Sequence, residues 1–289
     1  MLKDAGVVSR FAPSPTGALH LGHAFSAIRA HDLARAAGGR FLLRIEDIDP
    51  GRSREAFVRG IEADLRWLGL GWNGPVLRQS SRMGAYRAAL DRLEAAGLLY
   101  PCFCTRADIT AAASAPHGPE GPIYPGTCRV LSAADRARRM AREPHCWRLD
   151  MARALALAGP LTWEDGTAGI VAADPLRFGD VVLARKETPA SYHLGVTVDD
   201  AFQGVTDVVR GADLIEATHI HRLLQALLGL ATPRYHHHPL LTDAEGRRLA
   251  KRHGAPALAD LRAAGVDPEA LKESLRAGCL PVGIAAASA

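Results

Sequence analysis

Two histidines near the start of the chain stand three positions apart, directly after a loop rich in proline and glycine. They are His20 and His23, in the segment RFAPSPTGALHLGH over residues 10–23. If a helix begins there, both imidazoles lie on one face of its first turn, where unpaired backbone N–H groups and the helix dipole attract phosphate. As hydrogen-bond donors they could stabilise charge that grows on the α-phosphate of a nucleotide while pyrophosphate leaves. Gly22 between them leaves room for a flat base against the backbone.

Three cysteines in the middle of the chain have the spacing of metal ligands. Cys102, Cys104 and Cys128 supply three thiolates within 27 residues, and a tetrahedral zinc site needs a fourth ligand. Spacing alone favours His117 for that place. The alternative is three small buried thiols that bind no metal.

Three consecutive histidines, His236, His237 and His238, lie in the segment RYHHHPLL. In a strand, successive side chains point to opposite faces, so the three rings cannot converge on one ion. We therefore interpret these histidines as structural, and Cys279 as an ordinary core residue.

In the part of the chain that contains His20 and His23, apolar strands are expected to alternate with amphipathic helices. Strands are expected over residues 6–13, 41–49 and 75–81, and helices over 21–37 and 82–96. Ser53 can cap a further helix, in which Phe57, Ile61 and Leu65 recur at helical spacing. Strands that alternate with helices of this length indicate an α/β fold with a parallel sheet.

The alternation stops at about residue 101 and resumes at about residue 179. Alanine- and proline-rich loops and the cysteines fill the interval, where residues 145–151 have the pattern of an isolated strand. After it, a strand is expected over 180–187 and an apolar helix over 219–230. We therefore divide the chain into the first half of an α/β domain (1–100), a zinc-binding insertion (101–178), the second half (179–256) and a short helical tail (257–289).

The composition is that of an ordinary soluble protein. Of the 289 residues, 48% are hydrophobic and 23% are charged, and no run approaches the roughly 18 apolar residues of a membrane span. The start, MLKDAGVV, has no signal-peptide pattern, so we expect a cytoplasmic protein without a membrane partner. The net charge of +4 is compatible with an RNA partner. Only four of the 35 lysines and arginines are lysines, so Lys251 stands out as a flexible point charge.

The segment RFAPSPTGALHLGH resembles the signature of the class I aminoacyl-tRNA synthetases, and within them most closely the glutamyl branch. The resemblance implies a Rossmann-type catalytic domain that forms an adenylate from ATP with Mg²⁺. Its first motif, Pro13 to His23, implies that His20, Gly22 and His23 bind ATP and that both histidines take part in catalysis.

The same resemblance implies a second motif of the Lys-Met-Ser-Lys-Ser type, on a mobile loop that delivers a lysine to the phosphates of ATP. The corresponding stretch is RLAKR, Arg248 to Arg252. It departs from the pattern at Arg248, Ala250 and Arg252, and it keeps Lys251, which we expect to bind ATP and act in catalysis. An exposed basic turn is the alternative.

The resemblance also implies a pocket for L-glutamate. An amino acid with a second carboxylate needs a cation for that carboxylate and an anion or dipole for its ammonium group. Arg210 can pair bidentately with a carboxylate, and Glu46 belongs to the acidic segment IEDID. By resemblance, the pocket residues are Arg10, Phe11, Ala12, Pro13, Ser14, Glu46, Tyr192 and Arg210.

The chain is most similar to the family of glutamyl-Q tRNA(Asp) synthetases, short relatives of glutamyl-tRNA synthetase, and the similarity covers roughly residues 8–256. In that family the fourth zinc ligand is a tyrosine four residues before the last cysteine. The resemblance thus implies one structural Zn²⁺ per chain, held by Cys102, Cys104, Tyr124 and Cys128. The phenol has a pKa near ~10 and would need the metal to deprotonate it.

A full glutamyl-tRNA synthetase continues into a long helical region that reads the anticodon, whereas 33 residues follow Pro256 here. We therefore expect no anticodon-binding domain. The resemblance implies that the protein activates L-glutamate with ATP and transfers it to queuosine in the anticodon stem-loop of tRNA(Asp). We expect it to be a monomer. The alternatives are a truncated glutamyl-tRNA synthetase that charges a 3′ end, another class I nucleotidylyltransferase, and a non-catalytic RNA-binding paralogue.

Overall fold

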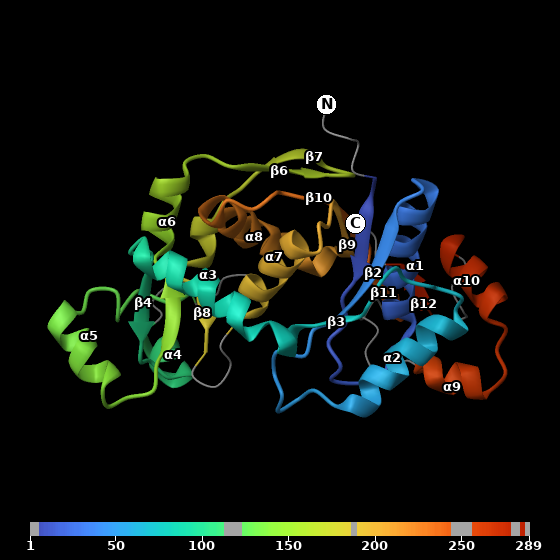
Figure 1. The fold of residues 1–289 in the computed structure, drawn as a ribbon, viewed down its shortest axis with the longest axis horizontal. Coiled ribbons are helices and arrows are strands. Elements are labelled where there is room, and N and C mark those ends of the chain that lie inside the picture. The colour runs from blue at the N-terminus through green and yellow to red at the C-terminus, as the bar shows by residue number, and fades with distance from the viewer. Residues whose placement is uncertain (1–5, 113–122, 186–189, 244–255, 279–283, 287–289) are drawn as a thin grey trace.

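A three-stranded parallel sheet opens the computed structural model, which describes residues 6–112, 123–185, 190–243, 256–278 and 284–286 (Figure 1). Its strands are β1 (Val8–Phe11), β2 (Arg40–Ile45) and β3 (Leu77–Arg78), and β2 pairs in parallel with both neighbours. α1 (Leu21–Ala36) connects β1 to β2, while α2 (Glu55–Trp67) and α3 (Met83–Ala95) follow β2 and β3. The expected alternation is confirmed, although residues 79–82 form a 3₁₀ turn and do not continue β3.

The start of α2 differs from the expectation. Arg54 occupies the N-cap position and no side chain caps the helix there, so Ser53 is not the cap. Glu55 in the first turn places a negative charge near the positive end of the helix dipole instead. The expected apolar face is present, because Ile61 and Leu65 are buried in the core that α2 shares with α1 and the sheet.

A second sheet continues the first on the other side of β1. Its strands are β9 (Asp207–Gly211), β10 (Arg234–His238), β6 (Thr162–Asp165) and β7 (Gly169–Ala172); the first three are parallel, and β7 is antiparallel to β6. β9 lies beside β1, where Thr206 donates its backbone N–H to the carbonyl of Val8 at 2.9 Å. α7 (Tyr192–Phe202) and α8 (Ile215–Leu228) share an apolar core with α3. The parallel α/β architecture is thus confirmed.

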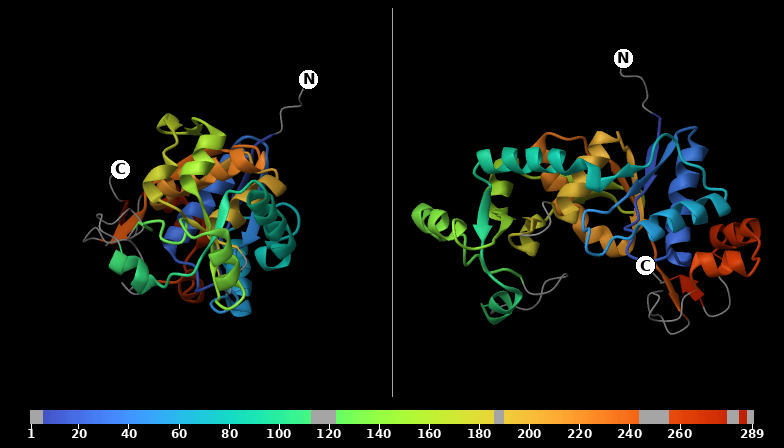
Figure 2. Two further views of the ribbon diagram at one scale, coloured as in Figure 1. Left: turned by 90° about the vertical axis from the view of Figure 1, so that its left-hand side faces the viewer. Right: turned by 60° about the horizontal axis from the view of Figure 1, so that its bottom comes forward.

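A third sheet consists of three antiparallel strands, β4 (Leu99–Cys102), β5 (Cys146–Leu149) and β8 (Val182–Ala184). Along the chain, β6 and β7 of the second sheet lie between β5 and β8. β5 is the central strand, so the expectation of an isolated strand over 145–151 is wrong: its partners come from distant parts of the chain. α4 (Arg106–Ala112) and α5 (Ala133–Met140) flank this sheet, and α6 (Met151–Ala158) packs on α8. Figure 1 and the right-hand view of Figure 2 show this region at one end of an elongated molecule.

The C-terminal segment lies at the opposite end of the molecule. α9 (Leu258–Ala263) and α10 (Pro268–Arg276) are helical, as expected, and Leu258 and Leu275 are buried in the same core as α1. A strand, β12 (Ile284–Ala286), pairs antiparallel with β11 (Leu241–Asp243), so the tail is not wholly helical. Among the residues described, no helix is both long and apolar enough to cross a membrane.

Gly39 allows the chain to pass from α1 into β2 in close contact with β1. A side-chain carbon at Gly39 would stand 1.9 Å from the carbonyl oxygen of Val7, which accepts the N–H of Arg40 at 2.8 Å. Because the obstacle is backbone, the strands must shift, and we expect Gly39→Ala to lower the free energy of unfolding by about 1–3 kcal/mol. Urea denaturation followed by circular dichroism measures this change.

The control is the same substitution inside α2. Gly60 has nothing within 4 Å of an added carbon, so Gly60→Ala is expected to leave stability unchanged or to raise it by up to ~1 kcal/mol. If Gly39→Ala were as stable as the control, the close approach of β1 would not constrain position 39.

Candidate active site

A cavity of about 620 Å³ opens where β1, β2, β9 and β10 end. Parallel strands end at one edge of a sheet, and ligands bind in the crevice there. The lining includes all the residues that the sequence predicts to bind L-glutamate, together with those described residues that it predicts to bind ATP. They are Arg10, Phe11, Ala12, Pro13, Ser14, His20, Gly22, His23, Glu46, Tyr192 and Arg210. Lys251 and the rest of the motif from Arg248 to Arg252 lie outside the described residues.

His20 and His23 lie at the start of α1, on the wall of the cavity. Nδ1 of His20 caps the helix by accepting the N–H of Gly22 at 3.1 Å, and Nδ1 of His23 accepts the N–H of His20 at 3.1 Å. In the neutral state each ring therefore carries its proton on Nε2 and is a hydrogen-bond donor there. A side-chain carbon at Gly22 would stand 3.0 Å from the His20 ring, so the glycine makes room for this cap.

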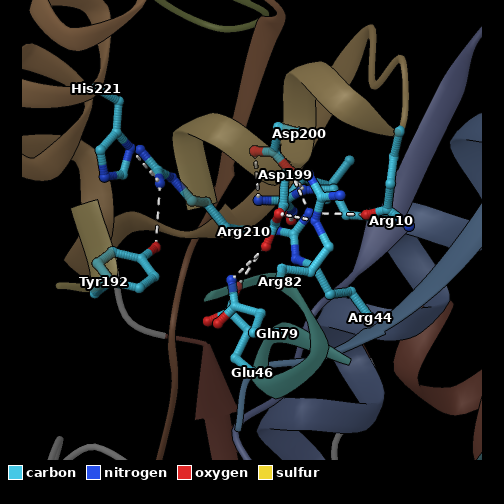
Figure 3. Close-up of polar contacts among 12 residues, drawn as sticks. Arg10, Arg44, Glu46, Gln79, Arg82, Tyr192, Asp199, Asp200, Arg210 and His221 are labelled. Carbon is cyan, nitrogen blue, oxygen red and sulfur yellow. Dashed lines mark hydrogen bonds and ion pairs between the residues drawn. The ribbon is translucent and has the colours of Figure 1, made fainter. Parts of the chain in front are cut away.

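Beneath the cavity, Asp200 on α7 bridges two buried arginines (Figure 3). Its carboxylate accepts hydrogen bonds from Arg10 at 2.9 and 3.3 Å and from Arg44 at 2.7 Å. Arg44, whose side chain is fully buried, also donates to Glu46 at 3.3 Å and to Gln203 at 2.9 Å. The network thus fixes two predicted glutamate ligands, Arg10 and Glu46, relative to each other.

Arg44 and Asp200 are site residues that the sequence analysis missed. A signal for Arg44 is present, because it places a charge within the otherwise apolar segment FLLRI. Asp200 has no comparable signal. Its two arginine partners lie 156 and 190 residues away along the chain, and no local pattern reveals contacts of that range.

The charges of this network follow from burial and pairing. Burial alone would raise the pKa of Asp200, but Arg10 and Arg44 outweigh it and hold that pKa below its ordinary value. For Glu46 burial is the larger effect, and its pKa is raised despite the attraction of Arg44 and Arg10. Asp200 is therefore ionised near neutral pH. The ionised form of Glu46, in contrast, would be stabilised by a further positive charge, such as the ammonium group of a ligand.

The neighbouring Asp199 joins α7 to α3. Its buried carboxylate accepts hydrogen bonds from Gln79 at 2.9 Å, Arg82 at 2.9 Å and Tyr86 at 2.5 Å. Successive residues on a helix point about 100° apart, so α7 contacts β1 and β2 through one carboxylate and α3 through the other. These contacts set the position of Tyr192, the first residue of α7, at the cavity.

Arg210 enters the cavity from β9 and is 4% exposed. Its Nη1 donates to the hydroxyl of Tyr192 at 3.4 Å, and its Nη2 donates to the hydroxyl of Thr218 at 2.6 Å. Nε donates to Nε2 of His237 at 3.2 Å, and Nη1 lies 3.2 Å from Nδ1 of His221. In the described part of the chain, no carboxylate is among the partners of this guanidinium.

The three consecutive histidines of β10 have separate partners, as the alternation of a strand predicts. His236 contacts Asp207 at 2.8 Å, and His238 lines the cavity. His237 contacts Arg210 directly. The interpretation of His237 as purely structural is therefore incomplete. The contact with Arg210 depends on how β9 and β10 pair, so no local pattern in the sequence predicts it.

The three cysteines predicted as metal ligands converge. The sulfur atoms of Cys102, Cys104 and Cys128 lie within 4.8 Å of one another, and those of Cys104 and Cys128 are 3.6 Å apart. The hydroxyl of Tyr124 lies 3.8 Å from the Cys104 sulfur and accepts the backbone N–H of Cys128 at 2.7 Å. Three thiols gathered in this way can hold a metal ion. His117, which spacing alone favours, lies outside the described residues.

Known proteins resemble this chain over most of its length. A model of the family "tRNA synthetases class I (E and Q), catalytic domain" matches residues 6–286. The glutamyl-Q tRNA(Asp) synthetase of Rhodobacter capsulatus is 53% identical, over 91% of this chain and 97% of the relative. A protein of the same name from Symbiobacterium thermophilum is 49% identical, over 90% of this chain and 82% of the relative. Another, from Deinococcus radiodurans, is 46% identical, over 91% of this chain and 85% of the relative.

Solved structures of larger proteins resemble it as well. A glutamate tRNA ligase from Elizabethkingia meningosepticum, in complex with its amino acid, superposes with a TM-score of 0.73 at 28% identity. The match covers 86% of this chain and 52% of that ligase. The glutamate-tRNA synthetase of Elizabethkingia anophelis gives the same score over 53% of its length. This chain thus spans about half the length of these solved ligases.

Asp200→Asn removes the anion that two buried guanidiniums share. Because Arg10 would lose its charged partner Asp200 and Arg44 would keep Glu46 alone of its two carboxylates, we expect the free energy of unfolding at pH 7 to fall by about 3–5 kcal/mol. Urea denaturation measures it. The control, Asp49→Asn, removes a carboxylate from the exposed pair with Arg52 and is expected to change stability little. Equal small effects of both substitutions would show that Asp200 does not anchor the network.

Proposed function

This chain belongs to the class I tRNA synthetases of the glutamate and glutamine type, and on that premise we propose that it activates L-glutamate and transfers it to queuosine in the anticodon of tRNA(Asp). One observation carries the proposal. A single cavity brings together two arginines, a carboxylate and a pair of histidines at a helix N-terminus. A dicarboxylic amino acid and a nucleotide phosphate need these groups.

In the first step, glutamate attacks ATP. Arg10 and Arg210 receive carboxylates of glutamate, and Glu46 receives its ammonium group. An oxygen of the α-carboxylate forms a bond to the α-phosphorus of ATP, and pyrophosphate leaves with the electron pair of the broken P–O bond, which gives glutamyl-adenylate. Negative charge grows on the α-phosphate oxygens, where the Nε2–H groups of His20 and His23 donate hydrogen bonds.

The departing pyrophosphate needs positive charge. We assign this role to Lys251, on the sequence argument that it is the lysine kept in the motif RLAKR. Mg²⁺ that arrives with ATP would neutralise further phosphate charge.

In the second step, a hydroxyl of the cyclopentenediol of queuosine attacks the carbonyl carbon of the adenylate. An ester bond forms, AMP leaves with the electron pair of the broken C–O bond, and the proton of the hydroxyl passes to solvent. The ribose hydroxyl of a tRNA 3′ end would react in the same way, so the acceptor is chosen by the RNA contacts and not by the chemistry. A reaction that uses ATP and tRNA also leads us to expect a cytoplasmic protein, and we expect it to act as a monomer.

We also propose that Zn²⁺ is the ion of the cysteine cluster, with Tyr124 as its fourth ligand. Three sulfurs and a phenol oxygen form a donor set that suits tetrahedral Zn²⁺. Arg148, whose guanidinium lies 3.8 Å from the centre of the Tyr124 ring, would offset the negative charge of such a site. The ion would join β4 to the segment around Cys128 and take no part in glutamate transfer.

Transfer of labelled glutamate to purified tRNA(Asp), with and without queuosine, tests the proposed function. We expect transfer only to the queuosine form, and a short anticodon stem-loop that contains queuosine should suffice. If that stem-loop ends in a 3′-phosphate, periodate can oxidise only the diol of queuosine and should abolish transfer.

Other outcomes would favour other activities. Robust glutamylation of queuosine-free tRNA at its 3′ adenosine would show a truncated glutamyl-tRNA synthetase. Glutamate-dependent ATP–pyrophosphate exchange without transfer to any tRNA would show a nucleotidylyltransferase of another kind. A complete lack of exchange would favour the non-catalytic RNA-binding paralogue.

Cys104→Ser tests the metal site. Because it removes one of the three clustered thiols, we expect bound zinc to fall from one ion per chain to well below half, measured by elemental analysis after dialysis. Cys146→Ser is the matched control, since Cys146 pairs opposite Cys102 between β4 and β5 but lies outside the cluster of three. It should retain the metal. Full zinc content in Cys104→Ser would refute the site.

A further inference from the structure

Neutral polar groups surround the guanidinium of Arg210. Figure 3 shows it directed toward His221 and Tyr192 and away from the network around Asp200. The hydroxyls of Tyr192 and Thr218 and the rings of His221 and His237 lie within 3.4 Å of its nitrogens. A guanidinium only donates hydrogen bonds, so each of these groups must present an acceptor to it.

Asp165 fixes the tautomer of His237. Its carboxylate lies 2.7 Å from Nδ1 of His237 and also accepts the backbone N–H groups of Thr167 and Ala168. Burial would raise the pKa of Asp165, but these hydrogen bonds lower it, so the group is a carboxylate and only accepts. Nδ1 of His237 therefore carries the ring proton, and its Nε2 is an acceptor for Arg210.

The rings of His221 and His193 provide a second imidazole acceptor for the guanidinium of Arg210. Nδ1 of His221 faces Arg210 and must accept, which leaves the ring proton on Nε2. That Nε2 lies 3.1 Å from Nδ1 of His193, which accepts the proton's hydrogen bond. Both ring nitrogens of His221 thus have partners in the neutral form.

Burial keeps all three rings neutral. Burial first, and the charge of Arg210 second, lower the pKa of His193 and of His237 to about 4 and that of His221 well below its ordinary value. Near neutral pH, no cationic imidazole faces the guanidinium. Among the described residues, Asp165 is the carboxylate that contacts one of these rings, and it does so at Nδ1 of His237, on the side away from Arg210.

Arg10 shows the contrasting arrangement in the same cavity. Asp200 lies 2.9 Å from its Nε and compensates its charge. A carboxylate placed in the same way against Arg210 would form a buried ion pair and weaken the attraction for a ligand's carboxylate. Neutral acceptors hold a guanidinium in position without that loss.

We propose that His193, His221 and His237 form a histidine cradle that positions Arg210 and sets the specificity of the cavity for glutamate over glutamine. The cradle supplies hydrogen bonds but no countercharge, so the full positive charge of Arg210 is available to a carboxylate. The amide of glutamine cannot neutralise that charge. This inference rests on the proposed function and adds the residues that give the cavity its preference for an anion.

His221→Glu tests the proposal directly. The charges of Arg210 and Arg10 act on position 221, so a carboxylate there is favourably placed and would neutralise Arg210. We expect kcat/KM for glutamate in ATP–pyrophosphate exchange to fall about 100-fold, mostly through KM, and the glutamate-to-glutamine ratio of kcat/KM to fall at least about tenfold. The matched control, His221→Gln, keeps a neutral acceptor of nearly the same shape and should stay within about fivefold of the wild type in both measures.

A second pair of variants guards against a local packing defect at position 221. The hydroxyl of Thr218 lies 2.6 Å from Nη2 of Arg210, on the same helix, and Thr218→Asp and Thr218→Asn differ only in charge. The acidic variant should show the same loss of glutamate preference, and the amide variant should not. Melting temperatures of all four variants check that they fold.

Binding of glutamate and of glutamine, measured by calorimetry without ATP, separates two kinds of failure. If the wild-type protein bound no glutamate, the proposed function and this inference would both be wrong. If it bound and activated glutamate, while each acidic variant kept the same glutamate-to-glutamine ratio as its amide control, the cradle would not determine specificity and the proposed function would stand.

Discussion

A positive charge in the dry interior of a protein must be compensated or fully hydrogen-bonded, and the cavity of this molecule is built around three such charges. Arg44 is enclosed by Asp200, Glu46 and Gln203, and Arg10 shares Asp200 with it. Arg210 has only neutral partners among the described residues. The partners come from β10, from α7 and α8, and from the residues that directly follow β2 and α7, so the arginines cannot be satisfied unless the two sheets and their helices are correctly assembled.

α7 supplies the carboxylate that compensates Arg10 and Arg44, and it also connects distant parts of the chain. Asp199 and Asp200 are adjacent in sequence, yet one contacts α3 and the turn before it, and the other contacts β1 and β2. A short helix thereby joins parts of the chain that lie more than 100 residues before it. Tyr192 at the N-terminus of the same helix reaches the cavity, so the position of this predicted glutamate-binding residue depends on contacts made one turn or more further along the helix.

Local patterns in the sequence predict the parts of the structure that depend on local physics. The apolar periodicity predicts β1, α1 and the parallel sheet, and the motif that ends at His23 locates the cavity. Features that depend on distant pairing are not predictable in this way: the central place of β5, the strand β12, and the partners of Arg44. His237 is instructive, because the alternation of β10 predicts that it points away from its neighbours but not that Arg210 lies at 3.2 Å on that side.

The antiparallel pairing of β11 with β12 and the bridge between His20 and Ala257 hold both ends of the segment that contains Lys251. Leu258 adds a hydrogen bond to the carbonyl of Leu19 at 2.9 Å. Ala257 and Leu258 thereby couple the start of α1 to the C-terminal segment, so the orientation of His20 depends on residues more than 230 positions away along the chain.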